Sequence, residues 1–390
     1  MSKEQKLHWI YACAPFLYRI ALILSTLYVF FRSRSWANRV FGVESGWILG
    51  LVFGTCLLLN FFTVKKHRTG PSRGTTYFAG IGTFVMIYLL MTIGTVDLVR
   101  LLCSACSLDA RILDRVFLVG GWLSVIVTLL CTVLGMYQVT KLKLLRYEVP
   151  VKSLSGRVRL VLLTDLHIGY FVGAKHMAKV RDLVNAQNSD MVLISGDMIN
   201  ASNTNECGEL PEVERILSEF QSREGTFAVV GNHDPDASDP EFQKFLQNSH
   251  IHLLEDAVYS DGTVNILGRT TKLKPRASIR ALKEQADDHL PSVVLDHDPI
   301  GIREAREEHI DLVLCGHTHR GQIFPLNLFV RFLYNRAETY GYHQQGDTVS
   351  VVSAGTGYFS MPMRLGSACE VITIDLIGKA PPPQAEQKIN

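Results

Sequence analysis

The sequence predicts an all-α, membrane-spanning region followed by a soluble α/β domain. Up to about residue 140 the chain consists of long apolar stretches with few charges. From Lys141 onward it has mixed charge and short apolar runs, two of which flank a segment of helical period; this pattern is typical of α/β proteins. We place the regions at residues 1–148 and 149–378, with a polar, proline-rich, disordered tail at 379–390.

The composition excludes several classes of protein. At 390 residues and 47% hydrophobic content, the chain exceeds one ordinary soluble domain. Its net charge is only +2 and its basic residues flank apolar segments, so we expect no nucleic-acid partner. Eight widely spaced cysteines, with a single CxxC at Cys103 and Cys106, imply no disulfide framework.

Four apolar segments are candidates for membrane spans, because a bilayer core needs about 20 apolar residues in a helix. Ser45–Val64, Thr75–Val96 and Val116–Val139 contain no charged side chain. Ile10–Phe31 contains Arg19, so it either spans the membrane or lies in its interface. We interpret it as spanning, and therefore predict a multi-pass integral membrane protein.

Lysine and arginine residues in the short loops set the orientation of such a protein. With four spans, their distribution favours both termini in the cytosol, which would place the α/β domain there too. If the first segment does not span, the number of spans becomes odd and the two termini lie on opposite sides of the membrane.

The first two strands of the α/β domain end in polar side chains. The run "VRLVLLTDLH" ends in Asp165 and His167, and "MVLISGDMIN" ends in Asp197, with a helix-period segment between them. This is a βαβ unit, so the two strands are parallel and their acids leave the same edge of the sheet. Ligands bind at that edge in open α/β sheets.

Three further apolar runs end in the same kinds of side chain. "GTFAVVGNHD" supplies Asn232, His233 and Asp234, "PSVVLDHDP" supplies His297, and "IDLVLCGHTHRG" supplies His317 and His319. Carboxylates and imidazoles with an amide and no thiolate suit divalent Mn, Fe or Zn. These residues exceed the coordination of one ion, so we predict two divalent ions about 3.5–4 Å apart, bridged by a carboxylate.

The motifs DxH, GD, GNHD, an isolated His and GHTH, in this order over residues 149–375, resemble those of the calcineurin-like metallophosphoesterases. The resemblance implies a sandwich of two mixed sheets flanked by helices. It also implies a role for each polar residue: Asp165, His167 and His319 for the first metal ion, Asn232, His297 and His317 for the second, Asp197 as the bridge, and His233 as an acid oriented by Asp234.

Later residues narrow the resemblance. "GHTHRGQIFPL" and "GTGYFSMPMRLGSACEVITIDL" are similar to a membrane-associated bacterial subgroup, and the preceding spans make the whole chain resemble animal transmembrane proteins with a metallophosphoesterase domain. Arg320 stands where the subgroup has Gly, and Ala368 and Cys369 stand where prolines are common. Arg320 and Arg364 are candidate ligands of the substrate phosphate. Alternatively, each pairs with a surface carboxylate.

These features together predict a membrane-anchored hydrolase of a phosphoester, with a phosphodiester favoured and a hydroxide bridging two metal ions as nucleophile. The alternative is a catalytically silent membrane scaffold or receptor with the same fold. The apolar stretch at residues 322–346, which contains Phe329 and Phe332, has two interpretations. It either packs under the sheet or forms a membrane-dipping lip that gives access to a lipid-linked phosphoester.

Overall fold

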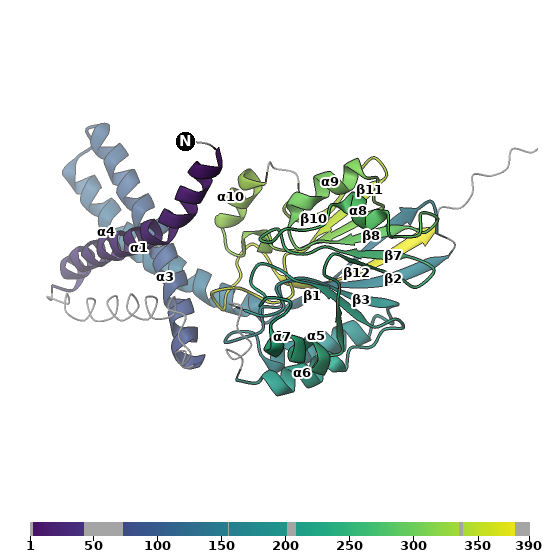
Figure 1. Cartoon of the computed structure of the whole chain (residues 1–390). Coiled ribbons are helices and arrows are strands. Elements are labelled where there is room, and N and C mark those ends of the chain that lie inside the picture. Colours follow the sequence, from purple (N-terminus) through teal and green to yellow (C-terminus); the bar gives the residue numbers. More distant parts are fainter. Residues whose placement is uncertain (1–2, 43–72, 155, 201–207, 335–337, 379–390) are drawn as a thin grey trace, which may run out of the picture. The chain divides into compact units, whose positions relative to one another are not determined.

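The computed structural model describes residues 3–42, 73–154, 156–200, 208–334 and 338–378 (Figure 1). The chain forms two compact units, residues 1–135 and 136–390. The predicted span Ser45–Val64 and the predicted disordered tail lie outside the described residues.

The described part of the first unit is helical. It contains α1 (Lys3–Phe41), α3 (Arg73–Ala105) and α4 (Ala110–Val139), which continues into the second unit. Two of the described helical segments, Gly74–Ala105 and Ala110–Val139, are long and apolar enough to cross a membrane. They include the predicted spans Thr75–Val96 and Val116–Val139. The predicted first span lies within α1, which is not one of these two.

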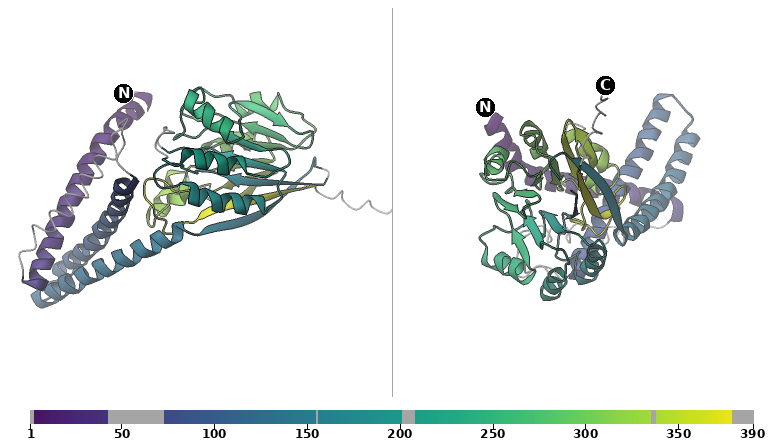
Figure 2. Two further views of the ribbon diagram at one scale, coloured as in Figure 1. Left: turned by 90° about the horizontal axis from the view of Figure 1, so that it is seen from below. Right: turned by 90° about the vertical axis from the view of Figure 1, so that its right-hand side faces the viewer.

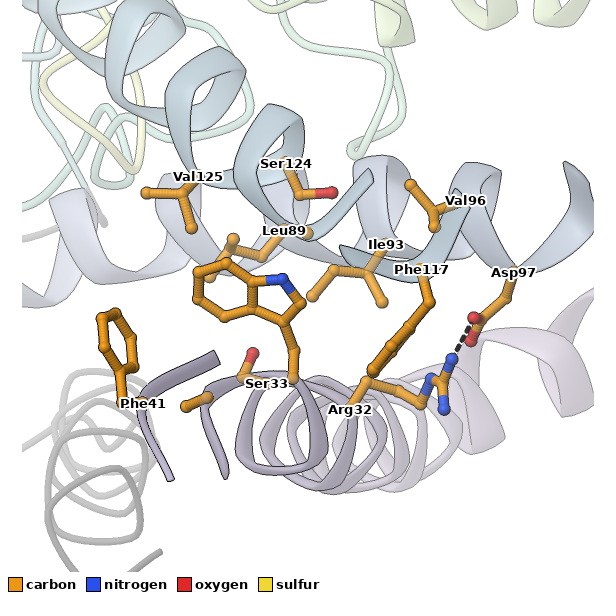
Figure 3. A pocket seen from close by; sticks show the side chains of 13 residues that line it. Arg32, Ser33, Phe41, Leu89, Ile93, Val96, Asp97, Phe117, Ser124 and Val125 are labelled. Atoms are coloured by element: carbon orange, nitrogen blue, oxygen red, sulfur yellow. Dashed lines mark hydrogen bonds and ion pairs between the residues drawn. The ribbon is translucent and has the colours of Figure 1, made fainter. Parts of the chain in front are cut away.

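Side chains from α1, α3 and α4 enclose an apolar pocket of about 340 Å³ (Figure 3). At one end of it Arg32 forms an ion pair with Asp97, which also accepts a 2.8 Å hydrogen bond from the Tyr28 hydroxyl. The guanidinium groups of Arg32 and Arg100 lie 5.1 and 4.8 Å from the ring centroid of Phe117. The charges of Arg32, Asp97 and Arg100 are therefore paired or stacked, which offsets the cost of placing them among apolar side chains.

The second unit is built on two six-stranded sheets. The first contains, in spatial order, β1 (Leu142–Val151), β12 (Cys369–Gly378), β2 (Arg157–Leu163), β3 (Met191–Ser195), β4 (Thr226–Val229) and β5 (Ile251–Leu253). β12 and β2 are antiparallel and the other neighbours are parallel, so the sheet is mixed.

The second sheet is also mixed. It contains β10 (Gly341–Gln345), β11 (Thr348–Val352), β9 (Leu312–Cys315), β8 (Ser292–Leu295), β7 (Asn265–Gly268) and β6 (Ala257–Ser260). The pairs β10–β11 and β6–β7 are antiparallel, and the three pairs between them are parallel.

Helices flank both sheets (Figures 1 and 2). α5 (Ala174–Asn185), α6 (Leu210–Ser218) and α7 (Pro240–Asn248) lie on the first sheet, and α8 (Ile279–Lys283) and α9 (Ile302–Glu307) lie on the second. Two 3₁₀ turns, η2 (Pro299–Gly301) and η3 (His319–Gly321), and helix α10 (Leu326–Leu333) complete the unit. The predicted fold of two mixed sheets flanked by helices is confirmed.

The central strands read as continuous apolar runs because both of their faces are buried. In β2, Leu160 and Leu162 point into the core between the sheets, whereas Val161 and Leu163, which are also fully buried, face the other way. In the second sheet, Val294 and Val313 belong to a cluster of buried side chains that includes residues of α8 and α9.

The second unit begins earlier than the boundary predicted at residue 149. β1 starts at Leu142 and pairs with β12 over its 10 residues, from Leu142 opposite Cys369 to Val151 opposite Gly378. Lys143 and Arg146 interrupt the apolar pattern of this strand because it lies at the edge of the sheet and is only partly buried. The predicted boundary at residue 149 therefore falls inside β1.

Candidate metal centre

The polar loops of the second unit meet where the two sheets are joined. β2, β3 and β4 are mutually parallel, and so are β8 and β9, so the loops that follow them leave matching edges. Ser195, the last residue of β3, donates a hydrogen bond of 2.9 Å to the carbonyl of Asp296, which follows β8. Its hydroxyl also lies 3.2 Å from the carbonyl of Leu314 in β9. This connection brings both sets of loops to one site.

Three potential metal ligands form a first group in the interior. Nε2 of His167 lies 3.0 Å from Nε2 of His319, and Oδ1 of Asp165 lies 3.3 Å from Nε2 of His319 and 3.9 Å from Nε2 of His167. Asp165 and His167 are buried. Lone pairs of two imidazoles and a carboxylate thus converge on one point, which is the geometry that a cation requires.

A second group surrounds Nε2 of His297. This nitrogen lies 3.1 Å from Oδ1 of Asn232, 3.2 Å from Nδ1 of His317 and 3.2 Å from Oδ2 of Asp197. The structure therefore assembles the second predicted ligand set around one point as well.

Asp197 connects the two groups. The same oxygen, Oδ2, lies 3.2 Å from Nε2 of His297 and 3.7 Å from Nε2 of His167. The other oxygen accepts a 2.8 Å hydrogen bond from the backbone N–H of His233. Oδ2 is thus placed between the ligand groups, where a bridging carboxylate would have to be.

The backbone of the site requires glycine next to the ligands. A Cβ atom at Gly231 would overlap the carboxylate of Asp197, and one at Gly316 would overlap the side chains of Thr164 and Asp165. Five ligand residues also have left-handed backbone conformations that non-glycine residues rarely adopt: Asp165, His167, Asp197, His317 and His319, with φ between 47° and 71°. Such strain is concentrated at functional sites.

Hydrogen bonds from the protein orient the ligands. Nδ1 of His297 donates to the carbonyl of Ser195 at 2.8 Å, because a carbonyl can only accept. Oδ2 of Asp165 accepts from the Thr164 hydroxyl at 2.7 Å and from the backbone N–H of His317 at 3.0 Å. These contacts turn Nε2 of His297 and the free lone pairs of Asp165 toward the two groups.

The electrostatics of the site favour a positive charge. Burial alone would lower the pKa of His297, but Asp197 and Asp165 raise it to about 10. Burial lowers the pKa of His167 to about 3 and that of His317 to about 4. The buried carboxylates thus hold a proton on one imidazole while other imidazoles stay neutral. A divalent cation can replace that proton, so the donor set fits metal ions.

His233 and Asp234 lie beside the ligand groups. The ring centroid of His233 is 5.3 Å from that of His167. The carboxylate of Asp234 accepts hydrogen bonds of 2.8 Å from the backbone N–H groups of Ile199 and Gly231. Asp234 therefore fixes the loop that carries Asn232 and His233, and its predicted action on the His233 ring stays a prediction.

The two arginines predicted to bind substrate have different surroundings. Arg320 is exposed, with its guanidinium carbon 4.2 Å from the ring centroid of Tyr340. Arg364 is 0% exposed, and its guanidinium donates to the carbonyls of Ala354 and Gly357, both at 2.7 Å. This burial argues against the predicted contact of Arg364 with a substrate phosphate. Its hydrogen bonds instead stabilise the segment that contains Ala354 and Gly357.

Two residues of the site were not predicted from the sequence. The ring centroid of Phe359 lies 4.5 Å from that of His233 and 5.1 Å from that of His167, so Phe359 forms an apolar wall of the site. Oδ2 of Asp298 lies 3.5 Å from Nε2 of His317. The acid directly after His297 was a usable signal for Asp298, whereas no local pattern distinguishes Phe359 from other buried aromatics.

Comparisons with known proteins agree with this geometry. Residues 158–321 match the family model described as calcineurin-like phosphoesterase. A Danio rerio protein named transmembrane protein with metallophosphoesterase domain is 29% identical over 352 residues, which cover 84% of this chain and 78% of the relative. A Bos taurus protein of the same name is 32% identical, covering 65% of this chain and 62% of the relative.

A bacterial relative also matches. An uncharacterized metallophosphoesterase of Helicobacter pylori is 31% identical over 251 residues, which cover 60% of this chain and 64% of the relative, slightly less than two thirds of its length. The part of the second unit that carries most of the ligand residues is therefore similar to the calcineurin-like phosphoesterases.

Proposed function

We propose that the chain is a membrane-anchored, metal-dependent phosphoesterase. The observation that carries the proposal is the position of Asp197, whose Oδ2 faces both ligand groups at 3.2 Å from His297 and 3.7 Å from His167. Two adjacent cation sites that share a carboxylate are the arrangement used to clamp the oxygens of a phosphoryl displacement.

The two ligand groups would hold two divalent ions, of which Mn, Fe and Zn suit the donors. Asp165, His167 and His319 would hold one ion, and Asn232, His297 and His317 the other, with Asp197 shared between them. When bound, such ions polarise the phosphoryl group and make water a nucleophile at neutral pH. A third group of donors, Asp287, Asp288 and His289, is exposed, and exposed acidic residues often lie together without binding an ion.

His233 is the side chain that we assign to proton transfer. Its ring lies next to both the ligand His167 and Phe359, and its backbone N–H donates a hydrogen bond to Asp197. Burial lowers the pKa of His233, and the negative charge of a bound phosphate would counteract this by favouring the protonated ring. His233 can then donate its proton to the departing oxygen.

A phosphodiester is the favoured substrate class. A monoester carries a second negative charge, which phosphatases commonly balance with arginine side chains. Around this site Arg364 is buried and bound to carbonyl groups, which leaves Arg320 as the exposed arginine next to the ligand histidines among the described residues. The lower charge of a diester fits this surface better.

Two observations support membrane anchoring. The Danio rerio and Bos taurus relatives are named transmembrane proteins, and α3 and α4 contain segments long and apolar enough to cross a bilayer. The distribution of lysine and arginine residues favours a cytosolic domain. We include several spans and this orientation in the proposal.

The test uses the full-length chain in detergent, stripped of metal and reloaded with Mn²⁺. We expect hydrolysis of an aryl phosphodiester that is abolished by chelation and by Asp197→Ala. The control is Asp347→Ala, which removes an exposed carboxylate paired with Lys152. Unchanged turnover in Asp197→Ala would rule out the shared carboxylate. A metal-loaded chain that hydrolyses neither diesters nor monoesters would favour the silent scaffold.

A further inference from the structure

The exposed apolar side chains of the second unit are not scattered over its surface. From Leu142 onward, the large apolar side chains that are exposed among the described residues fall in three short segments. We call this set the apolar rim; it consists of Leu273, Ile300, Phe324, Leu326, Leu328, Phe329 and Phe332. Exposed apolar side chains gathered in one region mark a binding surface rather than the random exposure of single residues.

Two segments of the apolar rim are linked to the second ligand group through Asp298. Ile300 lies in η2, whose first turn is capped by Asp298, and the carboxylate of Asp298 is 3.5 Å from Nε2 of His317. Leu273 follows Lys272, which forms an ion pair with the same carboxylate. Ile300 thus lies two residues after Asp298, and Leu273 follows a residue that pairs with Asp298, the acid next to the proposed metal ligand His317.

The third segment, centred on α10, is fixed to the site at both ends. At its beginning, a Cβ atom on Gly321 of η3 would overlap the backbone of Asn327, so the first turn of α10 packs directly against the turn that carries His319. At its end, the ring centroid of Tyr334 lies 6.4 Å from that of His317. α10 is therefore a part of the wall around the proposed metal ions.

The exposed side of α10 has the character of a membrane-binding helix. Leu328, Phe329 and Phe332 are 47%, 59% and 63% exposed, and the spacing of Leu328 and Phe332 places them one turn apart on the same side. The helix carries Arg331 and no acidic residue. An apolar face with basic neighbours is typical of helices that lie in the interface of a bilayer with anionic lipids.

The chain itself brings a bilayer close to this domain. α4, which is apolar and long enough to span, ends at Val139, and β1 begins at Leu142. The intervening Thr140 and Lys141 allow little separation between the end of a span and the start of the first sheet. A bilayer is thus the surface that this domain would meet most often.

We infer that the apolar rim inserts into the membrane surface around the metal centre, and that the substrate is a phosphoester whose hydrocarbon part remains in the bilayer. The inference rests on the proposed hydrolase function and adds a substrate class to it. The phosphoryl group would reach the ligands from the lipid headgroup region, while Arg320 and Arg331 face the anionic surface.

Photo-crosslinking tests the membrane contact without relying on activity. The full-length chain is reconstituted in vesicles of phosphatidylcholine and phosphatidylglycerol, with p-benzoylphenylalanine in place of Phe329. The matched control places the same group at Gln247, an exposed position of α7 on the first sheet. We expect labelling of radioactive phosphatidylcholine from position 329 only. Equal labelling from both positions, or adducts with a second copy of the chain in place of lipid, would overturn the inference.

A pair of substrates then tests the substrate class. Both contain the same aryl phosphodiester group, but one is soluble and the other carries a long alkyl chain held in the vesicles. We expect Phe329→Glu with Phe332→Glu to lower the ratio of lipid to soluble turnover at least about tenfold, because two charges must enter the interface. Gln247→Glu should leave that ratio unchanged.

The two proposals fail in different ways. If the parent chain hydrolyses neither substrate with Mn²⁺, the hydrolase function is wrong, while the crosslinking result still decides whether the rim contacts lipid. If the parent hydrolyses the soluble substrate and the double variant keeps the same ratio, the lipid-linked substrate class is wrong and the hydrolase function stands.

Discussion

The Oδ2 atom of Asp197 lies 3.2 Å from Nε2 of His297, although the two residues follow strands of different sheets. The same oxygen faces His167 in the other ligand group. A single carboxylate that serves both groups makes the two proposed metal sites dependent on each other, since its loss removes a negative charge from each.

This dependence leads to a prediction about metal content. Asp197→Asn should reduce the number of tightly bound Mn²⁺ ions by more than His317→Ala, because His317 belongs to one group only. The check is elemental analysis of the purified full-length chain after dialysis. If Asp197→Asn retains as much metal as the parent chain, the shared position of its carboxylate has no functional meaning.

His233→Ala should separate proton transfer from metal binding. Removal of a general acid costs about 10²–10⁴-fold in rate, and the loss should grow as the leaving group becomes more basic. The variant should still bind metal, since the ring of His233 is not among the convergent ligand atoms. The measurement is a series of aryl phosphodiesters of increasing phenol pKa. A uniform loss over the whole series would contradict an acid role.

Much of the site could be predicted because its signals are local. Asp165, Asp197, Asn232, His297 and His317 each follow a short apolar run, and parallel strands deliver such residues to a common edge. The resemblance to a known family then supplied the second sheet, which the apolar runs do not reveal. The hydrogen bond from Ser195 to the carbonyl of Asp296 that joins the sheets depends on tertiary packing and has no sequence pattern.

The incorrect or missing predictions share a physical cause. Arg364 was predicted to bind a substrate phosphate, yet it is buried and donates to the carbonyls of Ala354 and Gly357 in the interior. The boundary predicted at residue 149 falls inside β1 because the charged residues of this edge strand are exposed. In each case burial was set by contacts with residues far away in the sequence. Local patterns do not carry that information.

Arg364 should act as a positioning residue of the first ligand group. Its Nη2 lies 3.3 Å from Nδ1 of His319 and donates to the carbonyls of Ala354 and Gly357. Arg364→Lys cannot reproduce this fork, so we expect metal affinity to fall about 10–100-fold, as for other outer contacts of metal ligands. Calorimetric titration with Mn²⁺ measures this. Arg320→Lys is the control and should bind Mn²⁺ like the parent chain, since Arg320 is exposed. Equal affinities in all three proteins would contradict the positioning role.

His176 should make the stability of the second unit depend on pH. Its Nε2 donates a 2.9 Å hydrogen bond to the carbonyl of Thr356, and burial lowers its pKa from 6.5. The unfolded chain therefore binds a proton at a higher pH than the folded chain does. The stabilisation is complete above 6.5 and is lost as the pH falls from there toward the folded pKa, because protonation then favours unfolding.

His176→Gln isolates this contribution. Glutamine keeps an N–H donor for the carbonyl of Thr356 but does not titrate. Thermal unfolding of the full-length chain in detergent, at saturating Mn²⁺, should show a smaller loss of stability between neutral and mildly acidic pH in the variant than in the parent. His250→Gln is the matched control, because it makes the same replacement at an exposed histidine of the second unit. If the slopes of parent and His176→Gln coincide, protonation of His176 is not coupled to unfolding.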